Sequence, residues 1–244
     1  MQFKYAAIAA AMASMVSGQA LAIPKSNGKE IIKGAPRPLS GFNDMNFKEF
    51  DRGQPCNSDK DQGSNTAVFV LANGATLQNV IIGADAFEGI HCEGACTLKN
   101  VWFRDVCEDA ITLKGSGAVL IEGGGAQNAV DKVIQHNGRG TTTIRNFQVS
   151  NVGKLFRSCG DCSNNGGPRN VVVDRVRAFG MKSDLVGINS NFGDTATVTN
   201  SCGSSKLVCQ EFKGVQKGQG ESPKLKTNTK CLGAQGKLQA LPAC

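Results

Sequence analysis

A short pattern that returns about every 22 residues constrains this chain more than any other feature of its sequence. From about Thr66 to Val215, apolar and polar residues alternate, end in Asn plus a hydrophobic residue, turn, and enter a second short strand. The second strands are predicted to begin at Glu88, Asp109, Lys132, Lys154, Asp184 and Lys206. Short β runs joined by Gly/Asn turns leave no room for a helix, so the repeat predicts an all-β solenoid.

Hydrophobic residues at one position of successive repeats predict the interior of the solenoid. Ile90, Ile111, Ile134 and Phe156 would stack along one internal line, with neighbouring coils about 4.8 Å apart. A leucine-rich repeat would need leucines at a fixed spacing and an outer helical segment, and this chain has neither. An ordinary β-sandwich is the remaining alternative, because its strands also alternate and turn often.

The first 22 residues have the features of a secretion signal. Lys4 gives a basic start, the stretch from Tyr5 to Val16 is apolar, and Ala20-Leu21-Ala22 forms an Ala-x-Ala end. We therefore predict a signal peptide at 1–22 and a secreted, extracellular protein. No stretch approaches the ~20 apolar residues that a membrane span needs.

The rest of the chain is predicted to form a single domain with additions at both ends. Residues 23–50 contain three prolines and scattered glycines, and we expect an N-terminal lead-in or cap there. Residues 51–215 are the predicted β-helix domain. Residues 216–244 lack the repeat but hold two cysteines, so we expect a C-terminal tail that is tied back to the body.

All ten cysteines follow the predicted signal peptide. An even number in an exported chain predicts disulfides, with a pairing that this reasoning leaves open. Zinc is the alternative for the close pairs Cys92/Cys96 and Cys159/Cys162, although an oxidising compartment favours bridges and the chain has only two histidines. The cysteines are Cys56, Cys92, Cys96, Cys107, Cys159, Cys162, Cys202, Cys209, Cys231 and Cys244.

The chain is basic, with a formal net charge of +7 at pH 7. On an exported protein, a basic surface indicates an anionic partner. Single-stranded nucleic acid is bound by basic runs interleaved with aromatic residues, and this chain has one Trp and one Tyr. We therefore expect an acidic polysaccharide as the partner, and neither nucleic acid nor a membrane.

Charged residues gather at one position of four consecutive repeats. Aligning the repeats places Glu88, Asp109, Lys132 and Lys154 there, with Glu108 beside Asp109. Carboxylates that converge from neighbouring coils suit Ca²⁺, a hard ion with about six to eight oxygen ligands. The alternative is a surface ladder of ion pairs, which contributes little to stability.

Six stretches between Phe50 and Gly214 carry a further signal, and together they cover nearly all of the repeat. They are 75–83, 88–92, 100–102, 105–110, 131–133 and 153–157. In order and in spacing, these stretches resemble the family 3 polysaccharide lyases, the small secreted pectate lyases of microbes that attack plant cell walls.

This resemblance implies a right-handed parallel β-helix, dependence on Ca²⁺ and cleavage of pectate. Carried over by position, the metal ligands are Glu88, Glu108 and Asp109, with Asp105 nearby. Glu88 stands where some members have Asp, which lengthens the reach of the ligand. A further site acid of the family lies shortly before Val68, where only Asp61 could serve. The implied basic residues of the site are Lys114, Lys132, Lys154 and Arg157.

The implied reaction is β-elimination. The C5 proton of a galacturonate residue is removed, the glycosidic oxygen at C4 leaves, and 4,5-unsaturated oligogalacturonates form. We assign Lys132 as general base with Arg157 as its rival, and expect nearby cations to lower the pKa of Lys132. Lys154 is assigned as a clamp on a substrate carboxylate, and Lys114 and Arg157 as substrate-binding residues.

Two other functions compete with this one. A pectin hydrolase on the same fold would need two separated carboxylates flanking the sugar, about 6.5–9.5 Å apart for inversion. This chain instead places an acidic cluster next to cations. A non-catalytic pectin-binding module is the second alternative.

We expect the protein to act as a monomer.

Overall fold

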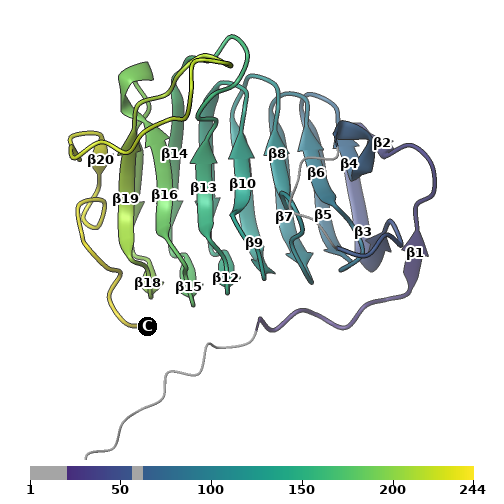
Figure 1. Cartoon of the computed structure of the whole chain (residues 1–244). Helices are drawn as coiled ribbons and strands as arrows, with labels where there is room; N and C mark the ends of the chain where they lie inside the picture. Colours follow the sequence, from purple (N-terminus) through teal and green to yellow (C-terminus); the bar gives the residue numbers. More distant parts are fainter. Residues whose placement is uncertain (1–20, 57–62) are drawn as a thin grey trace, which may run out of the picture.

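The computed structural model describes residues 21–56 and 63–244. The chain winds into a right-handed parallel β-helix whose coils stack along one axis (Figure 1). The predicted solenoid is thereby confirmed, and the β-sandwich alternative is wrong. Most of the predicted signal peptide, and Asp61, lie outside the described residues. Within the described part, no helix is long and apolar enough to cross a membrane.

The larger sheet covers one side of the solenoid and consists of parallel strands from every coil. Three short strands, β12, β15 and β18, pair beside its main path. Its strands are β1 (Lys29–Ile31), β3 (Phe42–Asp51), β5 (Ala75–Ile82), β7 (Cys96–Phe103), β9 (Val119–Gln127), β11 (Gly140–Arg145), β12 (Gln148–Ser150), β14 (Arg169–Asp174), β15 (Arg177–Phe179), β17 (Ala196–Thr199), β18 (Cys202–Gly203) and β20 (Cys231–Leu232).

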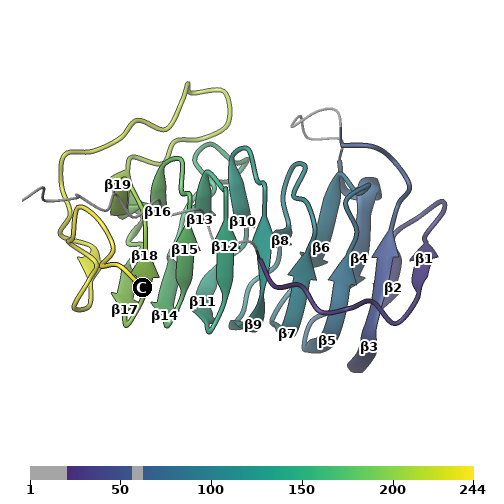
Figure 2. The same cartoon turned by 90° about the horizontal axis from the view of Figure 1, so that it is seen from below.

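The smaller sheet carries the predicted second strand of each repeat. Two 3₁₀ turns, Ser64–Thr66 and Ser190–Phe192, lie beside it in sequence. Its strands are β2 (Arg37–Leu39), β4 (Ala67–Leu71), β6 (Glu88–Cys92), β8 (Ile111–Leu113), β10 (Lys132–His136), β13 (Lys154–Ser158), β16 (Asp184–Asn189) and β19 (Leu207–Phe212). Residues 23–50, predicted as a cap, thus contribute strands to both sheets. Figure 2 shows the segment before β1 crossing the larger sheet.

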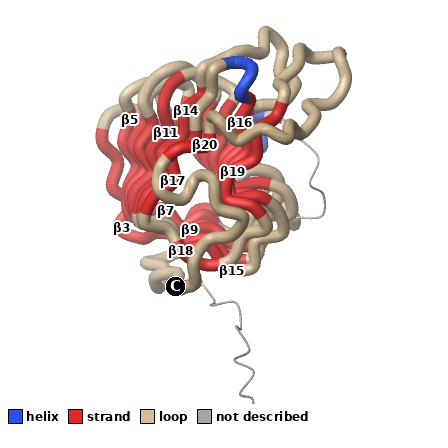
Figure 3. The backbone as a smooth tube through the Cα atoms, turned by 90° about the vertical axis from the view of Figure 1, so that its left-hand side faces the viewer, coloured by secondary structure: helices blue, strands red, loops and turns tan. Residues whose placement is uncertain are grey.

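The core is the predicted internal line of hydrophobic residues. Ile90 pairs with Ile111, Ile111 with Ile134, and Ile134 with Phe156, and all four are fully buried. Figure 3, viewed along the solenoid, shows the strands of each sheet stacked behind one another around this interior. The last repeat differs from the prediction by one residue, because Leu207 rather than Lys206 pairs with the Asp184 position.

Two asparagine ladders stabilise the coils, one within strands β5 and β7 and one in the turns that follow β9 and β12. Asn79 and Asn100 both adopt φ 51°, a left-handed conformation that Asn tolerates, and Asn100 Nδ2 donates to Asn79 Oδ1 at 3.1 Å. In the second ladder, Asn151 Nδ2 donates to Asn128 Oδ1 at 2.9 Å. Asn128 Nδ2 in turn donates to Asp105 Oδ1 at 2.8 Å, so Asp105 ends this ladder.

All ten cysteines form disulfides, as predicted, and the zinc alternative is therefore wrong. Two of the bridges tie the C-terminal tail to the last coils. Cross-links of this kind constrain the unfolded chain and stabilise the fold. The pairs are Cys56–Cys107, Cys92–Cys96, Cys159–Cys162, Cys202–Cys244 and Cys209–Cys231.

Candidate active site

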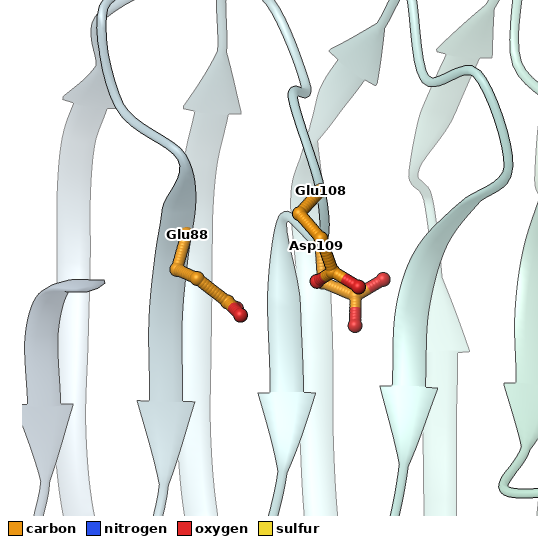
Figure 4. A group of neighbouring side chains, drawn as sticks. All are labelled: Glu88, Glu108 and Asp109. Carbon is orange, nitrogen blue, oxygen red and sulfur yellow. The ribbon is translucent and has the colours of Figure 1, made fainter. Parts of the chain in front are cut away.

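Three carboxylates meet on the outer wall of the smaller sheet. Glu88 is the first residue of β6, and Glu108 and Asp109 lie in the turn before β8. The coils are in register here, because the Gly89 amide donates to the Asp109 carbonyl at 3.0 Å. One oxygen from each carboxylate lies within 4.8 Å of the other two. Figure 4 shows Glu88 reaching from its coil toward Glu108 and Asp109 on the next.

Burial makes negative charge in this cluster costly. Asp109 is 4% exposed, and burial raises its pKa to about 6. Burial, with the charge of Asp109, raises the pKa of Glu108 to about 9. Glu108 and Asp109, with the carboxylate of Glu88 beside them, form the kind of oxygen donor set that a hard divalent cation neutralises. The cluster therefore fits calcium.

Glu88 is held by two neighbours on the same wall. Its Oε2 lies 3.0 Å from His91 Nε2 and accepts a hydrogen bond from the Thr112 hydroxyl at 3.3 Å. His91 pairs with Thr112 in the register of β6 and β8, and both are buried. These contacts fix the carboxylate orientation, and the sequence reasoning assigned neither residue this role.

Lys132 lies at the edge of the cluster. Its Nζ is 3.2 Å from Asp109 Oδ1, 3.8 Å from Glu108 Oε1 and 3.1 Å from Asp131 Oδ2. Burial alone would lower the pKa of Lys132, but the surrounding carboxylates outweigh it and raise the pKa above the ordinary lysine value. The expected lowering by nearby cations is therefore wrong for the metal-free chain.

Lys154 lies one coil beyond Lys132, as the aligned repeats predicted. Asp131 lies between the two lysines, with Oδ1 3.6 Å from Lys154 Nζ. The lysine charges hold the pKa of Asp131 below its usual value against the opposing effect of burial. The sequence reasoning gave Asp131 no role, although it directly precedes Lys132.

Arg157 is fixed on three sides. Its guanidinium lies 3.8 Å from the Phe212 ring centroid, Nη1 donates to Asn189 Oδ1 at 2.8 Å, and Nη2 donates to the Ser222 hydroxyl at 3.0 Å. Burial lowers the pKa of Arg157 to about 10. Asn189 lies on the neighbouring coil, whereas Phe212 and Ser222 come from β19 and the tail, so the repeat could not reveal these last two partners.

Two adjoining hollows connect these groups. One, of about 150 Å³, lies over the carboxylates and is also lined by Lys114, whose Nζ is 3.5 Å from Glu93 Oε1. The other, of about 320 Å³, is lined by Lys132, Lys154 and Arg157. Gln135 lines both. The result is an open groove with the carboxylate cluster at one end and a mixture of cations and acids at the other. The cations are Lys132, Lys154, Arg157 and Lys224, and the acids are Asp131, Asp161 and Glu221.

The structure thus brings together seven of the eight predicted site residues along this groove. Asp105 is the exception, because it lies outside the group of three carboxylates and accepts the hydrogen bond that ends the second asparagine ladder. The seven residues are Glu88, Glu108, Asp109, Lys114, Lys132, Lys154 and Arg157.

The family model described as pectate lyase matches residues 20–219. "Probable pectate lyase E" of Neosartorya fischeri is 50% identical over 204 residues, which span 83% of this chain and 79% of that protein. "Pectate lyase E" of Emericella nidulans is 48% identical over 208 residues, or 84% of this chain and 80% of that protein.

Solved structures of pectate lyases are also similar to this chain. The crystal structure of the catalytic domain of pectate lyase PelI from Erwinia chrysanthemi aligns with a TM-score of 0.72 at 35% identity, covering 85% of this chain and 98% of that one. The structure of PelI in complex with tetragalacturonic acid aligns with a TM-score of 0.70 at 35% identity, covering 84% of this chain and 69% of that one.

Proposed function

Because this chain belongs to the pectate lyase family and is a pectate lyase, we propose that it cleaves (1,4)-α-D-galacturonan by calcium-dependent β-elimination and leaves 4,5-unsaturated oligogalacturonates. The observation that carries this proposal is the cluster of Glu88, Glu108 and Asp109 directly beside Lys132. The tetragalacturonic acid complex of PelI supports a galacturonate substrate. The predicted signal sequence supports secretion, and we propose that the enzyme acts as a monomer.

In this proposal, Glu88, Glu108 and Asp109 hold Ca²⁺. Bound there, calcium would supply Lewis-acid neutralisation of a substrate carboxylate and so increase the acidity of the neighbouring C5 proton. His91 and Thr112 orient Glu88 for this task. We leave Asp105 out of the ligand set, because its carboxylate holds a turn.

Lys132 is the proposed general base, because its Nζ is the amine next to the carboxylates. Arg157 is the rival, because burial has already lowered its pKa to about 10. Lys154 and Lys114 bind substrate carboxylates on either side. A general base must be deprotonated before it can accept the C5 proton. We therefore expect the rate of cleavage to be highest at alkaline pH.

The test is the product formed from polygalacturonate. A lyase leaves an unsaturated end that absorbs in the ultraviolet, whereas a hydrolase leaves reducing ends without that absorbance and a binding module leaves the polymer intact. We expect ultraviolet absorbance to rise with added Ca²⁺. Reducing ends that appear without absorbance would refute β-elimination.

A further inference from the structure

We propose that the pocket at the C-terminal end of the solenoid is a distal subsite that binds the galacturonate carboxylates of a long pectate chain, several sugars from the bond that is cut. This inference rests on the proposed function. It concerns a site formed by the tail, outside the groove that carries the chemistry.

The pocket has a volume of about 530 Å³ and lies between β19 and two segments of the tail. Its basic side chains are Lys224, Lys226 and Lys237, and none of the described residues that line it carries a carboxylate. The carboxylate hollow and the groove beside it both contain acids. Among these three cavities of the described chain, this one thus has the strongest preference for an anion.

The pocket continues the groove along the same face. Lys224 lines both cavities. Gln135 pairs with Arg157, Arg157 with Gly187, and Gly187 with Gln210, so Gln210 in the pocket stands in the same outward-facing row as the groove residues. The row from β10 to β19 crosses three coil steps, or roughly 14 Å at the usual strand spacing. A polymer seated at the carboxylates and running along this row reaches the pocket.

The walls of the pocket are fixed by hydrogen bonds and a disulfide. Glu211 is 1% exposed, and its Oε1 accepts a hydrogen bond from the Lys230 amide at 2.6 Å. Gln210 Nε2 donates to the Leu225 carbonyl at 2.9 Å. The Cys209–Cys231 disulfide joins β19 to the tail. Because these contacts already order the tail, a ligand would bind the pocket without the entropy cost of ordering a loop.

The chemistry of the lining suits an acidic sugar. Lysine ammonium groups attract one carboxylate per galacturonate residue, and the amide oxygen of Gln210 and the amides of Gln239 and Asn228 can bind hydroxyl groups. Because the lysines are exposed, their attraction is weakened by salt. Longer chains should therefore bind more tightly than short ones, most clearly at low ionic strength.

The test compares a double variant, Lys226→Gln with Lys237→Gln, against a charge-matched control, Lys25→Gln with Lys33→Gln. Lys25 and Lys33 are exposed and lie outside the three cavities. KM is measured at fixed saturating Ca²⁺ on polygalacturonate and on trigalacturonate, which is too short to span both sites. For the pocket variant, we expect KM on polygalacturonate to rise about 3- to 10-fold more than KM on trigalacturonate at low salt.

The difference between substrates should shrink at high salt and be absent from the control. Equal changes on both substrates, or none on polygalacturonate, would overturn the distal subsite. Wild-type protein that forms no unsaturated product from either substrate would instead refute the proposed function. In that case, calorimetry with polygalacturonate and no Ca²⁺ still tests the subsite. If the pocket variant binds polygalacturonate as tightly as wild type does, the subsite is refuted.

Discussion

As the proposed general base, Lys132 faces two conflicting demands. Three carboxylates lie within 4 Å of its ammonium and raise its pKa, yet a general base must be free of its proton. A divalent cation held by Glu108 and Asp109 would cancel much of that negative charge. The same ion would thereby favour both the acidity of C5–H and the neutral amine of Lys132.

Replacing Lys132 by Ala should lower kcat by about 10²- to 10⁴-fold with little change in KM, because the lost interaction belongs to the transition state. Lys154→Ala is the matched comparison from the next coil, and it should mainly raise KM. Steady-state kinetics on polygalacturonate give both numbers. Near-normal kcat in Lys132→Ala, together with loss of activity in Arg157→Lys, would transfer the role of base to Arg157.

The raised pKa values of Glu108 and Asp109 make a prediction about stability without calcium. The folded chain holds protons on these groups up to about pH 9 and about pH 6, whereas the unfolded chain releases them near their ordinary values. The folded state thus binds more protons in this window, so stability should fall as the pH rises through it.

Glu108→Gln removes the larger of these contributions. Thermal melts in chelator, from pH 5 to pH 9, should show a shallower decline of Tm for the variant than for wild type, and added Ca²⁺ should raise the wild-type Tm most at the alkaline end. Parallel Tm curves for the two proteins would show that Glu108 does not titrate in this way.

At the scale of the strands and turns, Asp105 tests the proposed difference between a carboxylate that holds a turn and the carboxylates proposed to bind calcium. Asp105→Ala removes the acceptor that ends the Asn128–Asn151 ladder, at a cost of about 1 kcal/mol. For a chain of this size, Tm should fall by about 2–4 °C while the Ca²⁺ dependence of turnover stays unchanged. A marked loss of apparent Ca²⁺ affinity in Asp105→Ala would return Asp105 to the ligand set.

The strand register carried most of what the sequence could predict about the site. The aligned repeats correctly placed Lys132 beside Lys154, because one coil repeats the next with the side-chain alternation of a strand. They could not predict the partners of Arg157, because Phe212 and Ser222 return from the last strand and the tail. The repeat did not reveal the hydrogen bond of Asp105 either, because its partner Asn128 belongs to the following turn.

Across the whole molecule, the solenoid was predictable because each coil buries its hydrophobic face only against its neighbours. The two ends of the solenoid were less predictable from the sequence. The first coil begins within residues 23–50, where the repeat pattern is not visible, and the pairing of the tail cysteines depends on contacts that sequence spacing does not encode. The tail also lines the basic pocket. Because the tail sequence has no repeat, the sequence could not predict this pocket.

We propose that the acidic cluster of Glu88, Glu108 and Asp109 holds the calcium required for β-elimination. The most direct test is the rate of unsaturated product formation, followed by ultraviolet absorbance against free Ca²⁺, for wild type and Asp109→Asn. Wild type should lose activity in chelator and saturate with Ca²⁺, and the variant should need about 10-fold more Ca²⁺ or more for half-maximal rate, since one charged ligand is lost. Activity that persists in chelator, or superimposable curves for the two proteins, would refute the proposed calcium site.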